Sequence, residues 1–133
     1  MYADLHIHTN YSDGIYSPKE IIEKAINARL QKIAITDHDN FLGSIEAQKI
    51  LDYNGSNLEL IPGIEFSCHD SGSEFHIIGL FIDFNNSNLS NLVSKMQNER
   101  MKSIKKIINH LRSKNIIIDF DKVISRAKGS VGR

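Results

Sequence analysis

The sequence has a single cysteine, Cys68, so the chain cannot form a disulfide within itself. It also lacks any apolar run near the roughly 20 residues that a membrane-spanning helix needs. The N-terminus shows no basic segment followed by an apolar stretch, the pattern of a secretory signal. Internal repeats and low-complexity segments are absent as well. We therefore expect a cytoplasmic protein that does not enter a membrane.

The chain also has no net charge, because 16 basic residues balance 16 acidic ones over the 133 residues. The charges are nevertheless unevenly placed. Residues 1–94 contain 13 acidic and 5 basic residues, a net charge of −8, whereas residues 95–133 contain 3 acidic and 11 basic residues, a net charge of +8. The basic part could attract a phosphate group or nucleic acid, or it could be an ordinary solvent-exposed helix face. A chain of this length suffices for one domain with a substantial core.

Hydrophobic patterning predicts alternating strands and helices. Strands are expected at residues 3–8, 32–36, 58–61 and 75–81, with Pro62-Gly63 breaking or bending the third. A first helix starts at a capping box of Ser17 and Glu20, and a second is expected over residues 43–52. This alternation is typical of βαβ units, which build a parallel sheet with its site at the carboxyl ends of the strands.

The chain beyond residue 84 has a different character. The spacing of its apolar residues predicts a long amphipathic helix over residues 89–114 and a short helical segment over 121–127. Arg100 projects onto the middle of the apolar stripe of the long helix. An arginine at such a position needs a paired charge or a polar cavity, because burying its charge alone is costly.

Side chains of the metal-ligand type follow the predicted strands. His6 and His8 lie two residues apart in the first strand, so both imidazoles face the same way. Because the carboxyl ends of parallel strands are neighbours, we expect six such side chains to converge, more than one tetrahedral ion uses. The six are His6, His8, Asp13, His38, Glu65 and His76. Glu65 could bridge two ions, and a multinuclear site of this kind clamps a phosphoryl group and activates water to attack it.

Each of these residues has a simpler interpretation when it is taken alone: a surface histidine, a helix cap, a surface acid or a turn aspartate. Their common placement favours the metal site. Asp37 and Asp39 are expected to support the ligands or to cap the next helix, and not to bind metal themselves. His69, in a Gly/Ser loop, and His110, on a helix, are expected to take no part in the site.

The sequence resembles the PHP family, the polymerase and histidinol phosphatase domain. The resemblance covers nearly the whole chain and is carried by residues 4–9, 12–14, 17–18, 35–39, 62–67 and 76–83. It implies a distorted seven-stranded α/β barrel, up to three ions of Zn, Mn or Fe, and phosphoesterase activity with a metal-bound water as nucleophile and no protein residue in that role. By motif position, the six residues above correspond to the first six metal ligands of the family. The Ser12-Asp13-Gly14 form resembles the branch that acts on nucleotides, including 3′,5′-nucleoside bisphosphates and RNA 5′ ends.

The resemblance also implies that the chain is the N-terminal portion of a longer domain. Residues 1–84 would be the first half of the barrel, residues 85–128 a helical insertion over the site, and residues 129–133 the start of the return to the barrel. The family's last three ligands lie further along than this chain reaches, so we expect the fragment alone to be inactive. Arg100 would reach the site from the insertion and bind a substrate phosphate; a snorkelling or salt-bridged arginine is the alternative.

The resulting hypothesis is a metal-dependent phosphoesterase that acts on a phosphorylated small molecule, a nucleotide or an RNA end. One alternative is a non-catalytic PHP module with a structural or interaction role. Another is a nucleic-acid-binding domain that uses the basic helix, although aromatic residues do not alternate with its basic ones and no known reader motif is present. The sequence identifies no stable protein partner.

Overall fold

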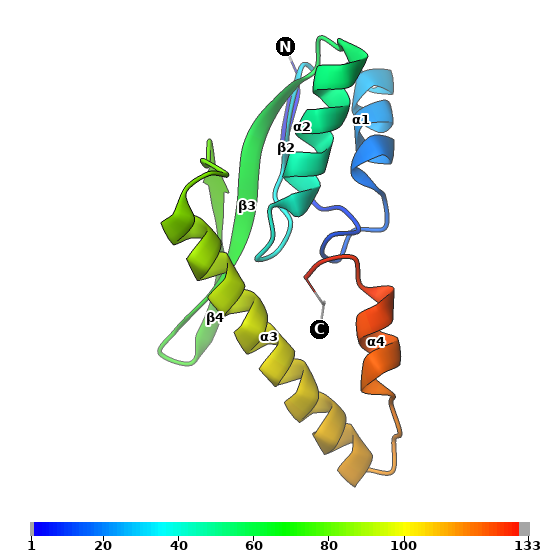
Figure 1. Ribbon diagram of the computed structural model, residues 1–133, viewed down its shortest axis with the longest axis vertical. Helices are drawn as coiled ribbons and strands as arrows, with labels where there is room; N and C mark the ends of the chain where they lie inside the picture. Colours follow the sequence, from blue (N-terminus) through cyan, green and yellow to red (C-terminus); the bar gives the residue numbers. More distant parts are fainter. Residues whose placement is uncertain (1, 131–133) are drawn as a thin grey trace.

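A computed structural model describes residues 2–130, which form one curled sheet with four helices among the described residues (Figure 1). The elements in chain order are β1 (Ala3–Ile7), α1 (Pro18–Asn27), β2 (Lys32–Ile35), α2 (Leu42–Asn54), β3 (Glu59–Asp70), β4 (Ser73–Leu80), α3 (Ser87–Ser113) and α4 (Phe120–Arg126). The strands are ordered β1-β2-β3-β4 across the sheet. No helix among residues 2–130 is long and apolar enough to cross a membrane.

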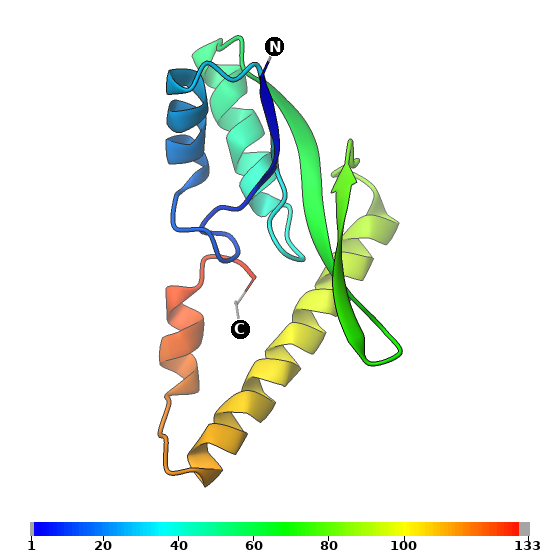
Figure 2. The same cartoon turned by 180° about the vertical axis from the view of Figure 1, so that it is seen from behind.

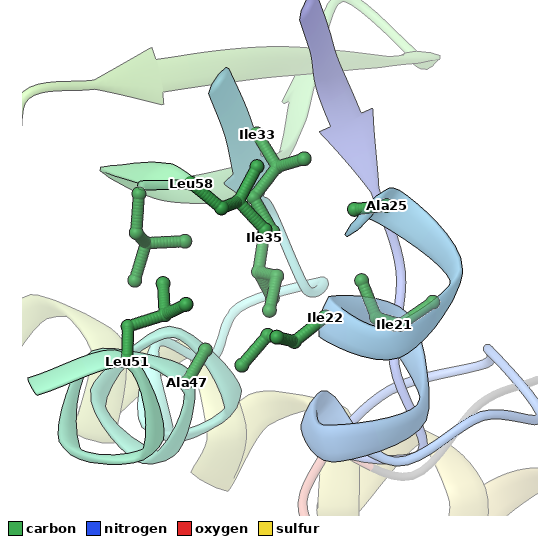
Figure 3. Packing of buried hydrophobic residues seen from close by; sticks show 9 residues of the cluster. Ile21, Ile22, Ala25, Ile33, Ile35, Ala47, Leu51 and Leu58 are labelled. Carbon is green, nitrogen blue, oxygen red and sulfur yellow. The ribbon is translucent and has the colours of Figure 1, made fainter. Parts of the chain in front are cut away.

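Helices α1 and α2 lie side by side on one face of the sheet, as Figures 1 and 2 show from opposite sides. The predicted capping box starts α1: the Ser17 hydroxyl accepts from the Glu20 amide, and the Glu20 carboxylate accepts from the Ser17 amide at 2.8 Å. Apolar side chains of the two helices meet those of β2 and β3 in one core (Figure 3). Its buried members are Ile21, Ile22, Ala25, Ile33, Ile35, Ala47, Leu51, Leu58 and Leu60. This core fixes the position of the strand ends that carry the site.

The sequence predicted that Pro62-Gly63 breaks or bends the third strand; the strand is continuous over 12 residues, so a break is wrong. The pair instead marks the point where β3 changes partner. Residues 59–62 pair with β2 in parallel, and residues 63–70 pair with β4. A Cβ atom on Gly63 would lie 2.9 Å from the Ile35 carbonyl oxygen, so glycine allows the close approach of β2 and β3 at this point.

The fourth strand runs antiparallel to β3, which corrects the expectation of an all-parallel sheet. Only Ser71 and Gly72 join the two strands, and both have positive φ, at 49° and 85°. A two-residue turn of this kind makes a hairpin, whereas a parallel connection needs a dozen or more residues. The antiparallel direction has a consequence for the site: the start of β4, which carries His76, lies beside the carboxyl end of β3.

The first half of α3 passes beside β3 and β4, and the rest of α3 extends with α4 beyond the sheet (Figures 1 and 2). Asn86 caps α3, which then runs for 27 residues and buries Val93, Ile104 and Ile108. After α4 the chain returns to the loop that follows β1, where the Ser130 amide donates to the Tyr11 carbonyl at 2.7 Å. The predicted division of the chain into a half-barrel (residues 1–84), an insertion (85–128) and a return segment (129–133) stays a prediction. Residues 131–133 of the return segment lie outside the described residues.

Candidate metal centre

The structure brings all six predicted ligands together at one end of the sheet. Their ligand atoms form three clusters, within each of which the atoms lie no more than 4.8 Å apart. The first cluster is His6, His8 and Glu65; the second is His8, Asp13 and His38; the third is His38, Glu65 and His76. Every pair of clusters shares one residue, so the three clusters form a closed ring.

Glu65 is the residue that the first and third clusters share, and only 6% of its side chain is exposed. One carboxylate oxygen, Oε2, lies 2.9 Å from His8 Nε2 and 3.2 Å from His6 Nε2. The other, Oε1, lies 3.3 Å from His76 Nδ1. Oε2 also lies 3.5 Å from His38 Nδ1. Glu65 therefore contacts histidines of both the first and the third cluster, as a bridging carboxylate requires. Glu65 stands inside β3 and not at its end, because β3 continues past β2 to pair with β4.

The spacing of these atoms is within about 0.4 Å of the spacing around a bound divalent ion. Zinc binds nitrogen and oxygen ligands at about 2.0–2.2 Å, which in tetrahedral geometry places neighbouring ligand atoms about 3.3–3.6 Å apart. In the first cluster the corresponding distances are 2.9, 3.0 and 3.2 Å. In the second cluster, His8 Nδ1 lies 3.1 Å from Asp13 Oδ1, and His38 Nε2 lies 3.7 Å from Asp13 Oδ2. The imidazole and carboxylate donors suit zinc, manganese and iron alike.

His38 supplies a second sign of fit. Its Nδ1 atom is buried and has no hydrogen-bond partner among residues 2–130. Burial lowers the pKa of His38 below the usual histidine range, although the Glu65 charge acts in the opposite direction. The imidazole is therefore neutral at pH 7, the protonation state that a metal ligand requires. A buried, unpartnered and neutral nitrogen beside a carboxylate is the arrangement that an ion would complete.

Asp37 holds the loop between the first two histidines and Asp13. Its carboxylate is fully buried and accepts three hydrogen bonds: from the Thr9 amide at 2.7 Å, the Thr9 hydroxyl at 2.7 Å and the Ser12 hydroxyl at 2.6 Å. A Cβ atom on Gly43 would lie 2.3 Å from the same carboxylate, so α2 can approach only with glycine there. Asp37 thus supports the ligand loop, one of its two predicted roles.

Neither Asp37 nor Asp39 caps α2. The helix begins after Phe41, which makes no capping bond, and the Asn40 side chain accepts from the Leu42 amide at 2.9 Å. The predicted capping role is therefore wrong for both aspartates. Asp39 instead forms an ion pair with Arg100, which corresponds to the salt-bridged alternative for that arginine.

A cavity of about 580 Å³ opens beside the ring of clusters. It is lined by Ser12, Asp13, His38, Glu74, Phe75, His76, Arg100 and Ser130.

The sequence reasoning did not include Glu74 or Ser130. Glu74 stands two residues before His76 on the same strand face, with an oxygen 3.5 Å from His76 Nε2, so the spacing rule that paired His6 with His8 would have found it. Ser130 carries no such signal, because only the return of the chain after α4 brings it to the cavity. His69 and His110 belong to none of the three clusters.

Comparison with known proteins gives a consistent assignment. The family model for the PHP domain matches residues 4–128. The 5′-3′ exoribonuclease Rnm of Escherichia coli K12 is 33% identical over 113 residues, which are 85% of this chain and 39% of that protein. The 3′,5′-nucleoside bisphosphate phosphatase of Chromobacterium violaceum is 36% identical over 80 residues, 60% of this chain and 27% of that protein.

A solved structure extends the likeness to the fold. A Bifidobacterium adolescentis protein described as a metal-dependent phosphoesterase superposes with a TM-score of 0.86 at 28% identity, over 99% of this chain and 46% of that one. The curled sheet therefore corresponds to part of a PHP barrel, and the chain spans less than half the length of each of these three relatives. On the match over residues 4–128, the chain belongs to the PHP domain family.

Proposed function

We propose that the complete protein is a metal-dependent phosphoesterase that hydrolyses a phosphate ester of a nucleotide or an RNA end. The observation that carries this proposal is the ring of three linked clusters, which opens into a cavity of about 580 Å³. A ring of three linked clusters is more than a structural ion needs, because structural sites are closed and use four ligands. An open multinuclear site beside a cavity is the arrangement found in phosphoester-cleaving enzymes.

The six ligands would hold up to three ions, one in each cluster. Each cluster offers three protein donors, so each would need a further donor, from water, substrate or the rest of the domain, to complete a tetrahedral ion. When bound, zinc, manganese or iron would neutralise charge on the phosphoryl oxygens and lower the pKa of a coordinated water. This assignment favours an enzyme over a non-catalytic PHP module, because all six side chains keep the chemistry of ligands.

The chain's own residues would bind and orient the substrate. Arg100 lines the cavity, and its planar guanidinium suits a phosphate, but the same group is engaged by Asp39 and Ser67. Its predicted contact with a substrate phosphate stays a prediction. The nucleotide or RNA character of the substrate is supported by the names of the two relatives above. Helices α3 and α4 would then be the insertion that covers the site.

The proposal is tested with the full-length protein, stripped of metal by a chelator and resupplied with Mn²⁺, Zn²⁺ or Fe²⁺. Substrates are an adenosine 3′,5′-bisphosphate and a 5′-phosphorylated RNA oligonucleotide, which separate a small-molecule phosphatase from an RNA-directed enzyme. We expect metal-dependent release of phosphate or nucleotide, and its loss in His8→Ala. His110→Ala is the matched control, since His110 is an exposed histidine on α3 outside the clusters. Hydrolysis that survives both chelation and His8→Ala would contradict the proposal.

A further inference from the structure

Helix α3 holds the residue next to His38 at two points. Arg100 donates from Nε to Asp39 Oδ2 at 3.1 Å and forms a second, shorter bond to the same oxygen from Nη2. One turn earlier on the helix, Gln97 donates from Nε2 to the Asp39 carbonyl at 2.9 Å. The ion pair is sheltered, with 14% of the Arg100 side chain and 3% of the Asp39 side chain exposed. Shelter of this degree distinguishes it from surface ion pairs, which contribute little.

Asp39 in turn ties His38 to Glu65. The Glu65 amide donates to the Asp37 carbonyl at 3.2 Å, and the Asp39 amide donates to the Glu65 carbonyl at 2.9 Å, so His38 lies between two bonds to one residue. These two bonds form an isolated parallel bridge between this loop and β3, beyond the point where the pairing of β2 with β3 ends. It sets the distance between two ligands that belong to the third cluster.

The Asp39 side chain extends this pairing by one step. Its backbone has φ of 48°, in the left-handed region, which turns the chain away from β3 at this residue. The backbone can no longer pair with the strand, and the Asp39 carboxylate takes its place: Oδ1 accepts from the Ser67 amide at 2.8 Å. Arg100 completes the arrangement, because it binds the other carboxylate oxygen and donates to the Ser67 hydroxyl at 2.7 Å.

We propose that Arg100 is a positioning residue of the metal centre, which acts through Asp39 to hold His38 in register with Glu65. This inference rests on the proposed metal site. Without the guanidinium, the buried Asp39 Oδ2 would lose the two hydrogen bonds that it accepts from Arg100 Nε and Nη2. The carboxylate would then turn toward solvent and release Ser67, and the loop that carries His38 would be free to move relative to β3.

The clusters should respond unequally to this change. His38 is a member of the second and third clusters but not of the first. Loss of the Arg100 contact should therefore weaken metal binding in the two clusters that contain His38 and spare the cluster of His6, His8 and Glu65. A general loss of stability would lower the affinity of all three clusters together, so the pattern separates positioning from a merely structural role.

The experiment measures Zn²⁺ and Co²⁺ binding to the full-length protein by competition with a chromophoric chelator, with the Co²⁺ absorption spectrum as a second readout. In Arg100→Ala we expect at least about a tenfold loss of affinity in some sites and wild-type affinity in the remaining one, since contacts behind the ligands typically change metal affinity 10–100-fold. Arg100→Lys should recover part of the affinity, because lysine can reach one oxygen but not make both bonds. Lys102→Ala, an exposed change on the same helix, should leave binding unchanged.

The outcomes are distinct. Unchanged affinity in Arg100→Ala together with a raised KM would overturn the inference and would favour a direct contact of Arg100 with the substrate. A wild-type protein that binds neither Zn²⁺ nor Co²⁺ would overturn the proposed function and this inference together. If Arg100→Ala does not fold, Gln97→Ala and Arg100→Lys decide: a selective loss in the same sites supports positioning, and wild-type binding in both contradicts it.

Discussion

Asp37 offers the sharpest test of how this fold supports its candidate site. Its carboxylate is fully buried and accepts two hydrogen bonds from Thr9 and one from Ser12. Hydrogen bonds to a charged group contribute roughly 1.5–3 kcal/mol each, and they are not additive. In Asp37→Ala, the Thr9 amide and hydroxyl would also be left buried without a partner, at a cost of about 1–3 kcal/mol each.

We expect Asp37→Ala to lower the free energy of unfolding of the metal-free protein by about 3–5 kcal/mol, a large part of the 5–15 kcal/mol typical of a domain. Asp37→Asn should cost about 1–2 kcal/mol, because the amide keeps one acceptor for the Thr9 amide but loses the charge. The measurement is urea unfolding followed by circular dichroism, with Asp52→Asn, an exposed acid on α2, as control. A change within about 0.5 kcal/mol for Asp37→Ala, the range of ordinary surface substitutions, would refute this account of the loop.

Two further predictions concern the ligands. Glu65→Gln should remove the ions from the first and third clusters and leave the ion of the second cluster, which lacks Glu65. Elemental analysis measures the metal content of the variant, and an unchanged content would contradict the bridging role. The pKa of His38 is lowered by burial, so below about pH 6.5, the ordinary value, the unfolded chain takes up a proton at this residue that the folded chain resists. The stability of the metal-free protein should therefore fall as the pH drops through that value and should be fully present above it. Melting temperatures between pH 7.5 and 5.5 test this, and His38→Asn should flatten the profile.

Much of this protein was readable from local patterns in the sequence. The capping box at Ser17, the alternation of strands with α1 and α2, and the length of α3 follow from spacing within a few residues, where periodicity and capping act. The convergence of the six candidate ligands was predicted from a rule about sheets and not from local spacing. Each one stands in or just after a strand, and neighbouring strands of one sheet bring such positions together.

The sequence analysis missed the direction of β4, and only the tertiary structure decided the partners of the charged residues. A two-residue turn at Ser71 and Gly72 forces a hairpin, and this hairpin, not a parallel crossover, brings His76 to Glu65. The pairing of Arg100 with Asp39 joins residues 61 positions apart. An apolar stripe shows that an arginine within it needs a partner, but which carboxylate serves depends on how a distant helix crosses the sheet. Local spacing determines elements and the faces that they present, whereas contacts between distant residues exist only once the chain has packed.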